Sequence, residues 1–398
     1  MVSVTTHTVL AEERAPSGVI WSGRRYIAEV FDGADEALAA LESVQGGLSA
    51  TGFQSLNWLT VLYEELAPAQ RAMPRLVVVS ERNSRDVCLI LPLVIKKKRS
   101  LRVARFADLG VSDYGAPILG PAAPTKRRSI RRMWRAVRGA LGDVDLIRLE
   151  RMPAEISGQK NPLLTRHGIT RARHSGNLVV IETTVEEFLR SRGKKYRKEV
   201  ERCSRLWEKE GSPRFSRASS QQEIARGFSI LEEQQSKRHA GLDSKYILDE
   251  TAYSSFYERM VMDGSDLKFS HLFTLEAQGV VVATLFGILH DGTFTLLRIA
   301  NGGVRWSHLS PGRLVVVETM KYFVERGVKR FDMGMGEYAF KRGFGATEVP
   351  LYDLIIARDL KGWPRAAFHR LKGRLRENPR LRLWVRGIKA KFRAKTPD

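Results

Sequence analysis

The sequence predicts an α/β (α+β) protein of two units, each a mixed, mostly antiparallel sheet flanked by helices, followed by a basic helical tail. Apolar residues at helical spacing alternate with short apolar runs typical of strands. One run of three strands is followed by a helix and a further strand, and a weaker form of this order occurs earlier in the chain. The length of 398 residues suits two to three domains.

The composition describes a chain able to form a core in a reducing compartment. Hydrophobic residues make up 43% of the sequence, so global disorder is not expected. The two cysteines, Cys88 and Cys203, exclude a disulfide framework and favour a cytoplasmic protein without a metal site. The N-terminus lacks a basic segment followed by an apolar core, so we expect no signal peptide.

A flexible leader is expected at residues 1–25 and a first unit at 26–176. Helical spacing predicts a helix over 53–66, and two apolar strands at 74–98 surround a polar turn at Asn83-Ser84. A strongly basic amphipathic helix follows at 128–141, then a strand at 143–153 and a short helix at 161–168.

The second unit is expected at residues 177–360. A strand (177–182) leads to a helical stretch over 184–211 that is interrupted at Gly193, and then to a helix at 222–239. Three strands between 267 and 300 are joined by turns at Gly279 and Asp291-Gly292. A helix (308–327) and strands at 328–334 and 348–357 complete the order.

Positive charge gathers in the tail, residues 361–398. The net charge of the chain is +22, and the tail holds thirteen Lys and Arg against two acidic residues. Basic residues alternate there with apolar ones such as Trp363, Phe368 and Leu371. Such a pattern suits an anionic membrane surface or a phosphate backbone. The tail therefore predicts association with the inner face of the membrane.

The segment "HLSPGRL" marks the start of a helix. Ser310 is a candidate N-cap and Pro311 suits the first helical position. Gly312 keeps the first turn bare and Arg313 adds a charge, which together favour binding of a phosphate or pyrophosphate at the helix N-terminus. The alternative is that these residues cap a helix without any ligand.

The segment "FDMGMGEYAFKRGFG" (331–345) follows a strand. Its G-x-G-x-x-A pattern resembles a dinucleotide-binding turn, but glycines break the helix that should follow and no repeated strand–helix units surround it. We interpret it instead as a strand end that is parted from its neighbour, where Gly334 and Gly336 admit a backbone or a thin ligand arm. Tyr338 could then donate a proton to a thiolate and Lys341 could hold an anion. The alternative is that these side chains pack or are solvated.

Two further polar clusters allow both a functional and a structural interpretation. The basic segment 192–205 could steer a polyanion, although an exposed basic helix explains it more simply. Acylation of an amine needs a proton acceptor. His239 or Glu233 could serve, yet a solvated charged face explains their cluster equally well: Glu232, Glu233, Lys237, Arg238 and His239.

Taken together, these segments resemble the CelD-like (cellulose-biosynthesis type) branch of the GNAT acyltransferases, a relative of the FemABX peptidyl transferases. The typical marks are a Ser-Pro-Gly at a helix start and a strand reading Phe-Asp-x-Gly-x-Gly-acid, here residues 310–312 and 331–337. The segments "FQSLNW", "LILPL" and "DYGAPILG" also look like the first half of such tandem proteins. In many relatives the Tyr and Lys are adjacent, whereas two residues separate Tyr338 from Lys341 here.

The resemblance implies tandem GNAT-like domains and transfer of an acyl group from acetyl-CoA or a longer acyl-CoA. The implied acceptor is an amine or hydroxyl of an envelope glycan, exopolysaccharide or lipid precursor. The alternatives are an aminoacyl-tRNA-dependent transferase, with tRNA as partner, and a non-catalytic binding module. The expected catalytic residues are Tyr338, Lys341, Glu337 and His239, and the expected cofactor-binding residues are Ser310, Pro311, Gly312, Arg313, Leu314, Gly334 and Gly336.

Overall fold

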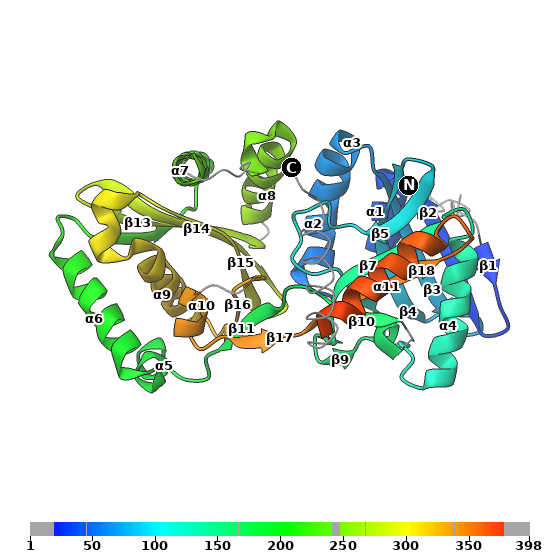
Figure 1. The fold of residues 1–398 in the computed structure, drawn as a ribbon. Coiled ribbons are helices and arrows are strands. Elements are labelled where there is room, and N and C mark those ends of the chain that lie inside the picture. Colours follow the sequence, from blue (N-terminus) through cyan, green and yellow to red (C-terminus); the bar gives the residue numbers. More distant parts are fainter. Residues whose placement is uncertain are drawn as a thin grey trace, which may run out of the picture.

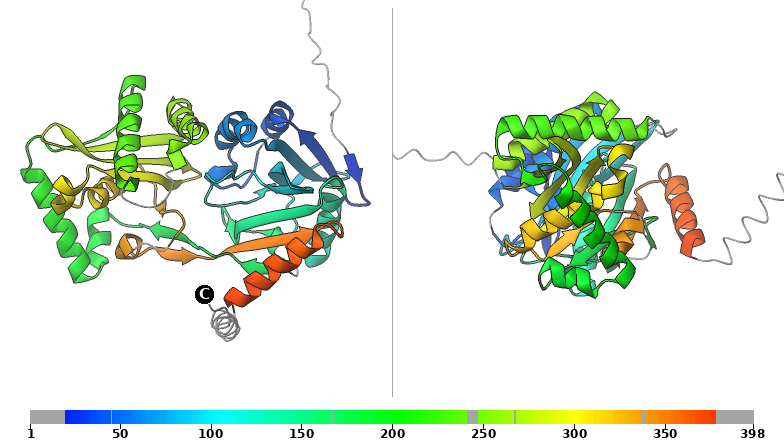
Figure 2. Two further views of the ribbon diagram at one scale, coloured as in Figure 1. Left: turned by 45° about the horizontal axis from the view of Figure 1, so that its top comes forward. Right: turned by 90° about the vertical axis from the view of Figure 1, so that its left-hand side faces the viewer.

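The protein consists of two sheets that lie side by side, each covered by helices (Figures 1 and 2). The computed structural model describes residues 20–44, 46–165, 168–240, 247–266, 268–336 and 339–377. This is the mixed α/β architecture, with sheets flanked by helices, that the sequence predicts.

The first sheet is mostly antiparallel and has the order β1-β2-β3-β4-β5-β7-β18-β10, with β6 beside β4. Only β5 and β7 are parallel neighbours within it. Its strands are β1 (Ile20–Ser22), β2 (Tyr26–Asp32), β3 (Met73–Glu81), β4 (Val87–Lys98), β5 (Leu101–Phe106), β6 (Ile118–Leu119), β7 (Leu146–Pro153), β10 (Ile169–Arg171) and β18 (Leu351–Ala357).

Helices cover both faces of the first sheet. The basic helix predicted at 128–141 is α4 (Arg127–Ala140), which buries Ile130, Met133 and Trp134 while its arginines face outward. The others are α1 (Ala34–Ser43), α2 (Leu56–Val61) with its π-helical continuation to Leu66, α3 (Ala67–Ala69) and α11 (Trp363–Glu377). The first sheet therefore buries both faces, as its long apolar strands require.

The second sheet has the order β12-β13-β14-β15-β16-β11-β17. Helices α7 and α8 lie on one face of it and α9 on the other (Figure 1). Its strands are β11 (Gly176–Val180), β12 (Arg214–Arg217), β13 (Ser270–Ala277), β14 (Val280–His290), β15 (Thr293–Asn301), β16 (Arg330–Asp332) and β17 (Thr347–Val349). Its helices are α5 (Val185–Ser191), α6 (Lys194–Lys209), α7 (Gln221–His239), α8 (Thr251–Asp266), α9 (Pro311–Val324) and α10 (Ala339–Gly343).

The two sheets repeat one order of elements. In each, an antiparallel meander ends in a strand (β5 or β15), a crossover helix follows (α4 or α9), and the next strand (β7 or β16) pairs with it in parallel. The parallel pairing is short in both sheets: three residue pairs join β5 to β7, and three join β15 to β16. Each sheet therefore opens where its parallel strands separate.

The two halves share one core. The indole of Trp58 in α2 meets the ring of Phe256 in α8 edge-on, with the two ring centroids 5.2 Å apart. Edge-on aromatic pairs prefer centroid separations of about 4.5–7 Å. At the rim of the same contact, Arg259 of α8 pairs with Glu64 and Glu65. Burial of these large rings fixes the position of one sheet against the other.

The strand predicted at 348–357 is divided between the sheets, which corrects its assignment to the second unit. β17 pairs with β11, but β18 pairs with β7 and β10 in the first sheet. The chain crosses back because the apolar side chains of Leu351 and Leu354 fill the first sheet's core. The predicted unit boundaries otherwise stay a prediction, and the leader and most of the tail lie outside the described residues.

Candidate functional site

The predicted phosphate-binding turn lies where α9 begins. Pro311 occupies the first helical position, as predicted, whereas Ser310 has a left-handed backbone (φ +49°) and makes no side-chain cap bond. Ser310 therefore occupies the predicted N-cap position, but its side chain does not cap the helix, because side-chain capping favours an extended backbone at that position. Pro311 and Leu314 are buried, while Ser310, Gly312 and Arg313 are half-buried and accessible.

Arg313 brings a guanidinium group to this turn. The group lies over the ring of Tyr196, 5.4 Å from the centroid, and its Nη1 forms a long ion pair with Glu199 at 3.5 Å. Its Nε is buried without a hydrogen-bond partner among the described residues. Glu199 accepts a shorter bond from Arg202, whose hydrogen bond lowers its pKa to about 2. Buried N–H groups without acceptors are costly, so an anion bound here would satisfy them.

The opening between β15 and β16 lies beside this turn. β16 pairs with β15 only up to Thr295 and Asp332, and β15 continues to Asn301 with β14 as its partner and no partner on the β16 side. A Cβ at Gly312 would lie 3.8 Å from Ile299 and 3.9 Å from Asn301, so the first turn of α9 packs on the free end of β15. In the β14–β15 ladder, the register shift leaves Leu297 as an extra residue. Such bulges leave a backbone N–H outside the ladder and are frequent beside active sites.

Side chains from both halves form hydrogen bonds with the backbone of the glycine-rich segment after β16 (residues 334–336). Lys341 Nζ donates to Gly334 O (3.1 Å) and Met335 O (2.6 Å), and Asn177 Nδ2 donates to Gly334 O and Gly336 O. Asp113, from the first half, accepts from Met335 N at 2.8 Å. The segment is therefore a fixed part of the site.

The backbone conformation and surroundings of Gly334 explain why a glycine is needed in this segment. Its φ is +75°, and a Cβ there would meet the Asp113 carboxylate oxygen at 2.6 Å. A side chain would therefore be strained and would also collide with the carboxylate. The group that approaches this glycine closely is a side chain of the first half.

Asp332 is a buried carboxylic acid at the point where the strands part. Burial raises its pKa to about 6, against the hydrogen bonds from the Tyr114 hydroxyl and from Gly334 N (2.8 Å). Burial and the neighbouring Asp332 in turn raise the pKa of Tyr114 well above its usual value. An acid that titrates near neutrality can take up or hold a proton at physiological pH.

Lys341 is buried and does not face an open mouth. Only 4% of the residue is exposed, and burial lowers its pKa despite the nearby Asp113 and Asp332. Its bonds to two carbonyl oxygens make it a residue that positions the glycine-rich segment. Its predicted role in holding a ligand anion stays a prediction.

The remaining predicted catalytic residues are less well placed or not described. Glu337 and Tyr338 lie outside the described residues. His239 ends α7, on the face of the sheet opposite α9, and is half-buried (Figure 1). Glu233 is exposed and pairs with Lys237, so a solvated ion pair describes these two residues.

The sequence interpretation missed four residues of this site. Asp113 and Tyr114 begin the segment "DYGAPILG" and Asn177 begins the strand predicted at 177–182, but nothing in their spacing indicates that they reach residues 332–336, the first two across the halves. Tyr196 lies in α6, and its ring packs against Phe344 and beneath Arg313. Its hydroxyl is buried with no partner among the described residues, and burial raises its pKa.

Within the described residues, no group of three or more His, Cys, Asp or Glu side chains is arranged to hold a metal ion. In the same part of the chain, every helix is too short or too polar to cross a membrane.

Comparison with known proteins assigns the region that holds this site. Residues 194–342 match the family model of the acetyltransferase (GNAT) domain. The GNAT match runs from α6 to α10 and so includes Tyr196, the turn at 310–314, Asp332 and the glycine-rich segment. The family match supports an acyltransferase of the GNAT fold. No curated protein matches the sequence.

Solved structures of similar fold extend over both halves. The crystal structure of FemX aligns with a TM-score of 0.52 and 13% identity, over 81% of this chain and 96% of FemX. The C-terminal domain of a putative lysylphosphatidylglycerol synthetase from Agrobacterium fabrum aligns with a TM-score of 0.49 and 12% identity, over 86% and 96%. A tandem GNAT protein from the clavulanic acid biosynthesis pathway gives 0.44 and 11%, over 83% and 99%. At 13% identity, the similarity to FemX is a similarity of fold alone.

Proposed function

We propose that this protein is an acyl-CoA-dependent N- or O-acyltransferase whose acceptor is a cell-envelope, polysaccharide or lipid precursor. The observation that carries the proposal is the accessible first turn of α9, with the guanidinium of Arg313 and its unsatisfied Nε, directly beside the parted strands β15 and β16. The GNAT match over residues 194–342 covers all of these elements.

The residues present fit a pyrophosphate-bearing thioester. In the first turn of α9, Arg313 N and Leu314 N donate to Ser310 O, so the backbone N–H of Gly312 and the guanidinium of Arg313 would hold the pyrophosphate. The bulge at Leu297 would present a backbone N–H to the carbonyl oxygen, which gains negative charge during transfer. Acyl-CoA, when bound, supplies the activated acyl group. The chain's part is to orient it and to stabilise that charge.

Asp332 is the proton acceptor that the structure adds to the earlier candidates, Glu233 and His239. It stands at the last paired position of β16, and its pKa of about 6 leaves it mostly ionised at pH 7. Tyr114 and Gly334 hold its carboxylate in place through hydrogen bonds.

A membrane location for the acceptor is supported by α11 and the residues before it. Four of the eight exposed large apolar residues among the described residues lie together here: Leu360 (90% exposed), Trp363, Phe368 and Leu371. Exposed basic residues flank them, as in helices that lie on anionic membranes: Lys361, Arg365 and Lys372.

Vesicle sedimentation tests the membrane contact. Phe368→Ser with Leu371→Ser should release the protein from vesicles containing anionic lipid, while Val304→Ser, which removes a still more exposed apolar residue elsewhere, should not. Point substitutions suit this test because α11 also covers β18 and β10, so that deleting it would uncover the first sheet. Equal binding of all three proteins would refute the contact.

Isothermal titration with CoA and acetyl-CoA tests the donor. Gly312→Asp should weaken CoA binding roughly tenfold or more, because like charges brought together repel. A Cβ at this position meets nothing closer than 3.8 Å, so the fold should tolerate it. Gln222→Asp is the matched control, since it places a carboxylate at the same second position of another helix, α7. If wild type binds neither ligand, acyl-CoA dependence is refuted.

The aminoacyl-tRNA alternative is favoured by exposed basic residues on α6, beside the same turn: Lys194, Lys195 and Lys198. It predicts binding of charged tRNA whose affinity falls steeply with salt, and no binding of CoA. The same set of titrations therefore separates the two donors.

A further inference from the structure

A cavity lies in the first half, at the opening between β5 and β7. Its volume is about 480 Å³, and its wall contains Arg105, Arg151 and Arg173. It occupies the place in the first sheet that the β15–β16 opening occupies in the second. None of its lining residues comes from α4, the helix that corresponds to α9, so it does not reproduce the turn that we assign to pyrophosphate.

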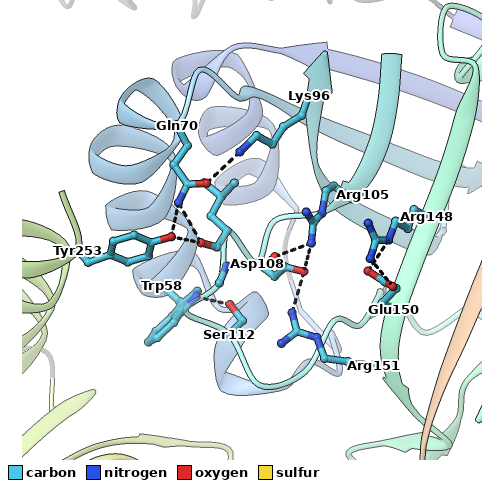
Figure 3. Close-up of polar contacts among 12 residues, drawn as sticks. Trp58, Gln70, Lys96, Arg105, Asp108, Ser112, Arg148, Glu150, Arg151 and Tyr253 are labelled. Carbon is cyan, nitrogen blue, oxygen red and sulfur yellow. Dashed lines mark hydrogen bonds and ion pairs between the residues drawn. The ribbon is translucent and has the colours of Figure 1, made fainter. Parts of the chain in front are cut away.

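The chemistry of the wall favours an anion. Asp108 is buried and shared by two guanidinium groups, at 3.2 Å from Arg105 and 2.8 Å from Arg151 (Figure 3). Glu150 pairs with Arg148, outside the lining, and Arg173 is exposed and has no acidic partner among the described salt bridges. Asp353 is the third carboxylate of the wall, so its three arginines face three acidic residues, and only the further Arg148 beside Glu150 gives a net charge of 4 − 3 = +1. Arg105 Nε is also buried without a hydrogen-bond partner among the described residues.

The backbone around the cavity is strained. Leu109 and Arg151 both line it and both have left-handed backbones, with φ of +39° and +59°. Asp353, a third lining residue, lies at a register shift in β18 and accepts a bond from Arg151 N at 2.9 Å. Left-handed residues other than glycine and bulges both cost stability, and they concentrate at binding sites.

The cavity adjoins the transferase site through two continuous walls. One wall is the segment 172–174, and the next residues hold the glycine-rich segment: Ser175 O accepts from Gly336 N at 3.2 Å. The other wall is 108–110, which leads to Asp113 and its bond to Met335 N. Tyr253 of the second half also contacts the 108–110 wall: its hydroxyl accepts a hydrogen bond from Gln70 and donates one to Leu109 O (Figure 3).

We propose that this cavity binds an oxyanion, a phosphate or carboxylate, carried by the acceptor substrate, with Arg105, Arg151 and Arg173 as its ligands. The forked guanidinium group matches both oxyanions. The cavity is much larger than one such group, so the rest of the acceptor has space beside it. The acceptor role rests on the proposed function; the anion site does not.

Titration of the full-length chain tests the site, in the Gly312→Asp background so that the turn of α9 cannot contribute. The probes are inorganic phosphate, acetate and glycerol 3-phosphate. Arg173→Ala and Arg105→Gln should each weaken binding of the preferred oxyanion roughly tenfold or more, the loss expected for a hydrogen bond to a charged group. Arg226→Ala, an exposed arginine on α7, is the matched control and should change nothing.

The outcomes separate this inference from the proposed function. CoA binding should be unchanged by Arg173→Ala, and its absence from wild type would refute the donor while leaving the anion site intact. The site would be overturned if neither Arg173→Ala nor Arg105→Gln changed the affinity for the oxyanion, or if no oxyanion bound at all. An organic phosphate that binds no better than inorganic phosphate would overturn the acceptor role and leave a site for free anions.

Discussion

Replacing Gly334 by alanine should destabilise the protein through two separable effects. The residue has φ +75°, which costs a non-glycine residue about 1–2 kcal/mol. The new Cβ would also lie 2.6 Å from the Asp113 carboxylate and displace it from Met335 N. Loss of a hydrogen bond to a charged group adds about 1.5–3 kcal/mol. The total expected loss is about 2.5–5 kcal/mol in the free energy of unfolding.

Gly279→Ala provides the matched control. Gly279 has nearly the same φ, +71°, but a Cβ there meets nothing within 4 Å. Its alanine variant should therefore lose only the backbone contribution, about 1–2 kcal/mol. Urea denaturation of both variants gives the free energies of unfolding, and their difference measures the contact with Asp113.

A double-mutant cycle decides whether Asp113 is the cause. In an Asp113→Ala background, Gly334→Ala should cost no more than Gly279→Ala does, because the colliding carboxylate is gone. If Gly334→Ala and Gly279→Ala cost the same in the wild-type background, the close approach across the two halves is refuted.

Three further outcomes are expected. Arg313→Ala should weaken CoA binding roughly tenfold by isothermal titration, whereas Arg326→Ala, at the exposed end of α9, should not. Lys341→Met should lower the urea midpoint, because two carbonyl oxygens lose their donor, and an unchanged midpoint would contradict its positioning role. The folded-state pKa of Asp332, about 6, lies above its unfolded value, so wild type should lose stability relative to Asp332→Asn as pH rises from about 3 to 7, by about 3 kcal/mol. Parallel stability curves for those two proteins would show that Asp332 titrates normally.

The sequence predicts most elements because their signals are local. Apolar periodicity gives α4 and α7, and the turn at Gly279 gives the hairpin of β13 and β14. β12 is short and polar, and α8 has weak periodicity, so neither was predicted. β18 is apolar enough to pair with an edge of either sheet, and the periodicity of its sequence does not indicate that it returns to the first.

Prediction of the site from sequence also fails where it depends on contacts between residues far apart in the chain. Pro311, Gly312 and Arg313 form a local motif, so their place at the start of α9 follows from sequence. The partners of Asp332 and Gly334 come from Asp113, Tyr114 and Asn177, which lie more than 150 residues away. The packing of the two halves brings Asp113 and Tyr114 there, and the pairing of β11 with β16 brings Asn177, and no spacing rule contains that information.

This long-range arrangement bears on what the first half does. If it served only as a second copy of the fold, its opening could be plainly apolar and it need not contact the glycine-rich segment. Instead, Asp113 adds to the hydrogen bonds that Lys341 and Asn177 give this segment, Tyr114 donates to the buried acid Asp332, and the same loop lines a charged cavity. Unpaired buried charges are costly, so such a cluster persists only where it is fully partnered or used. The second half carries the GNAT match, but its glycine-rich segment takes its final form only against the first.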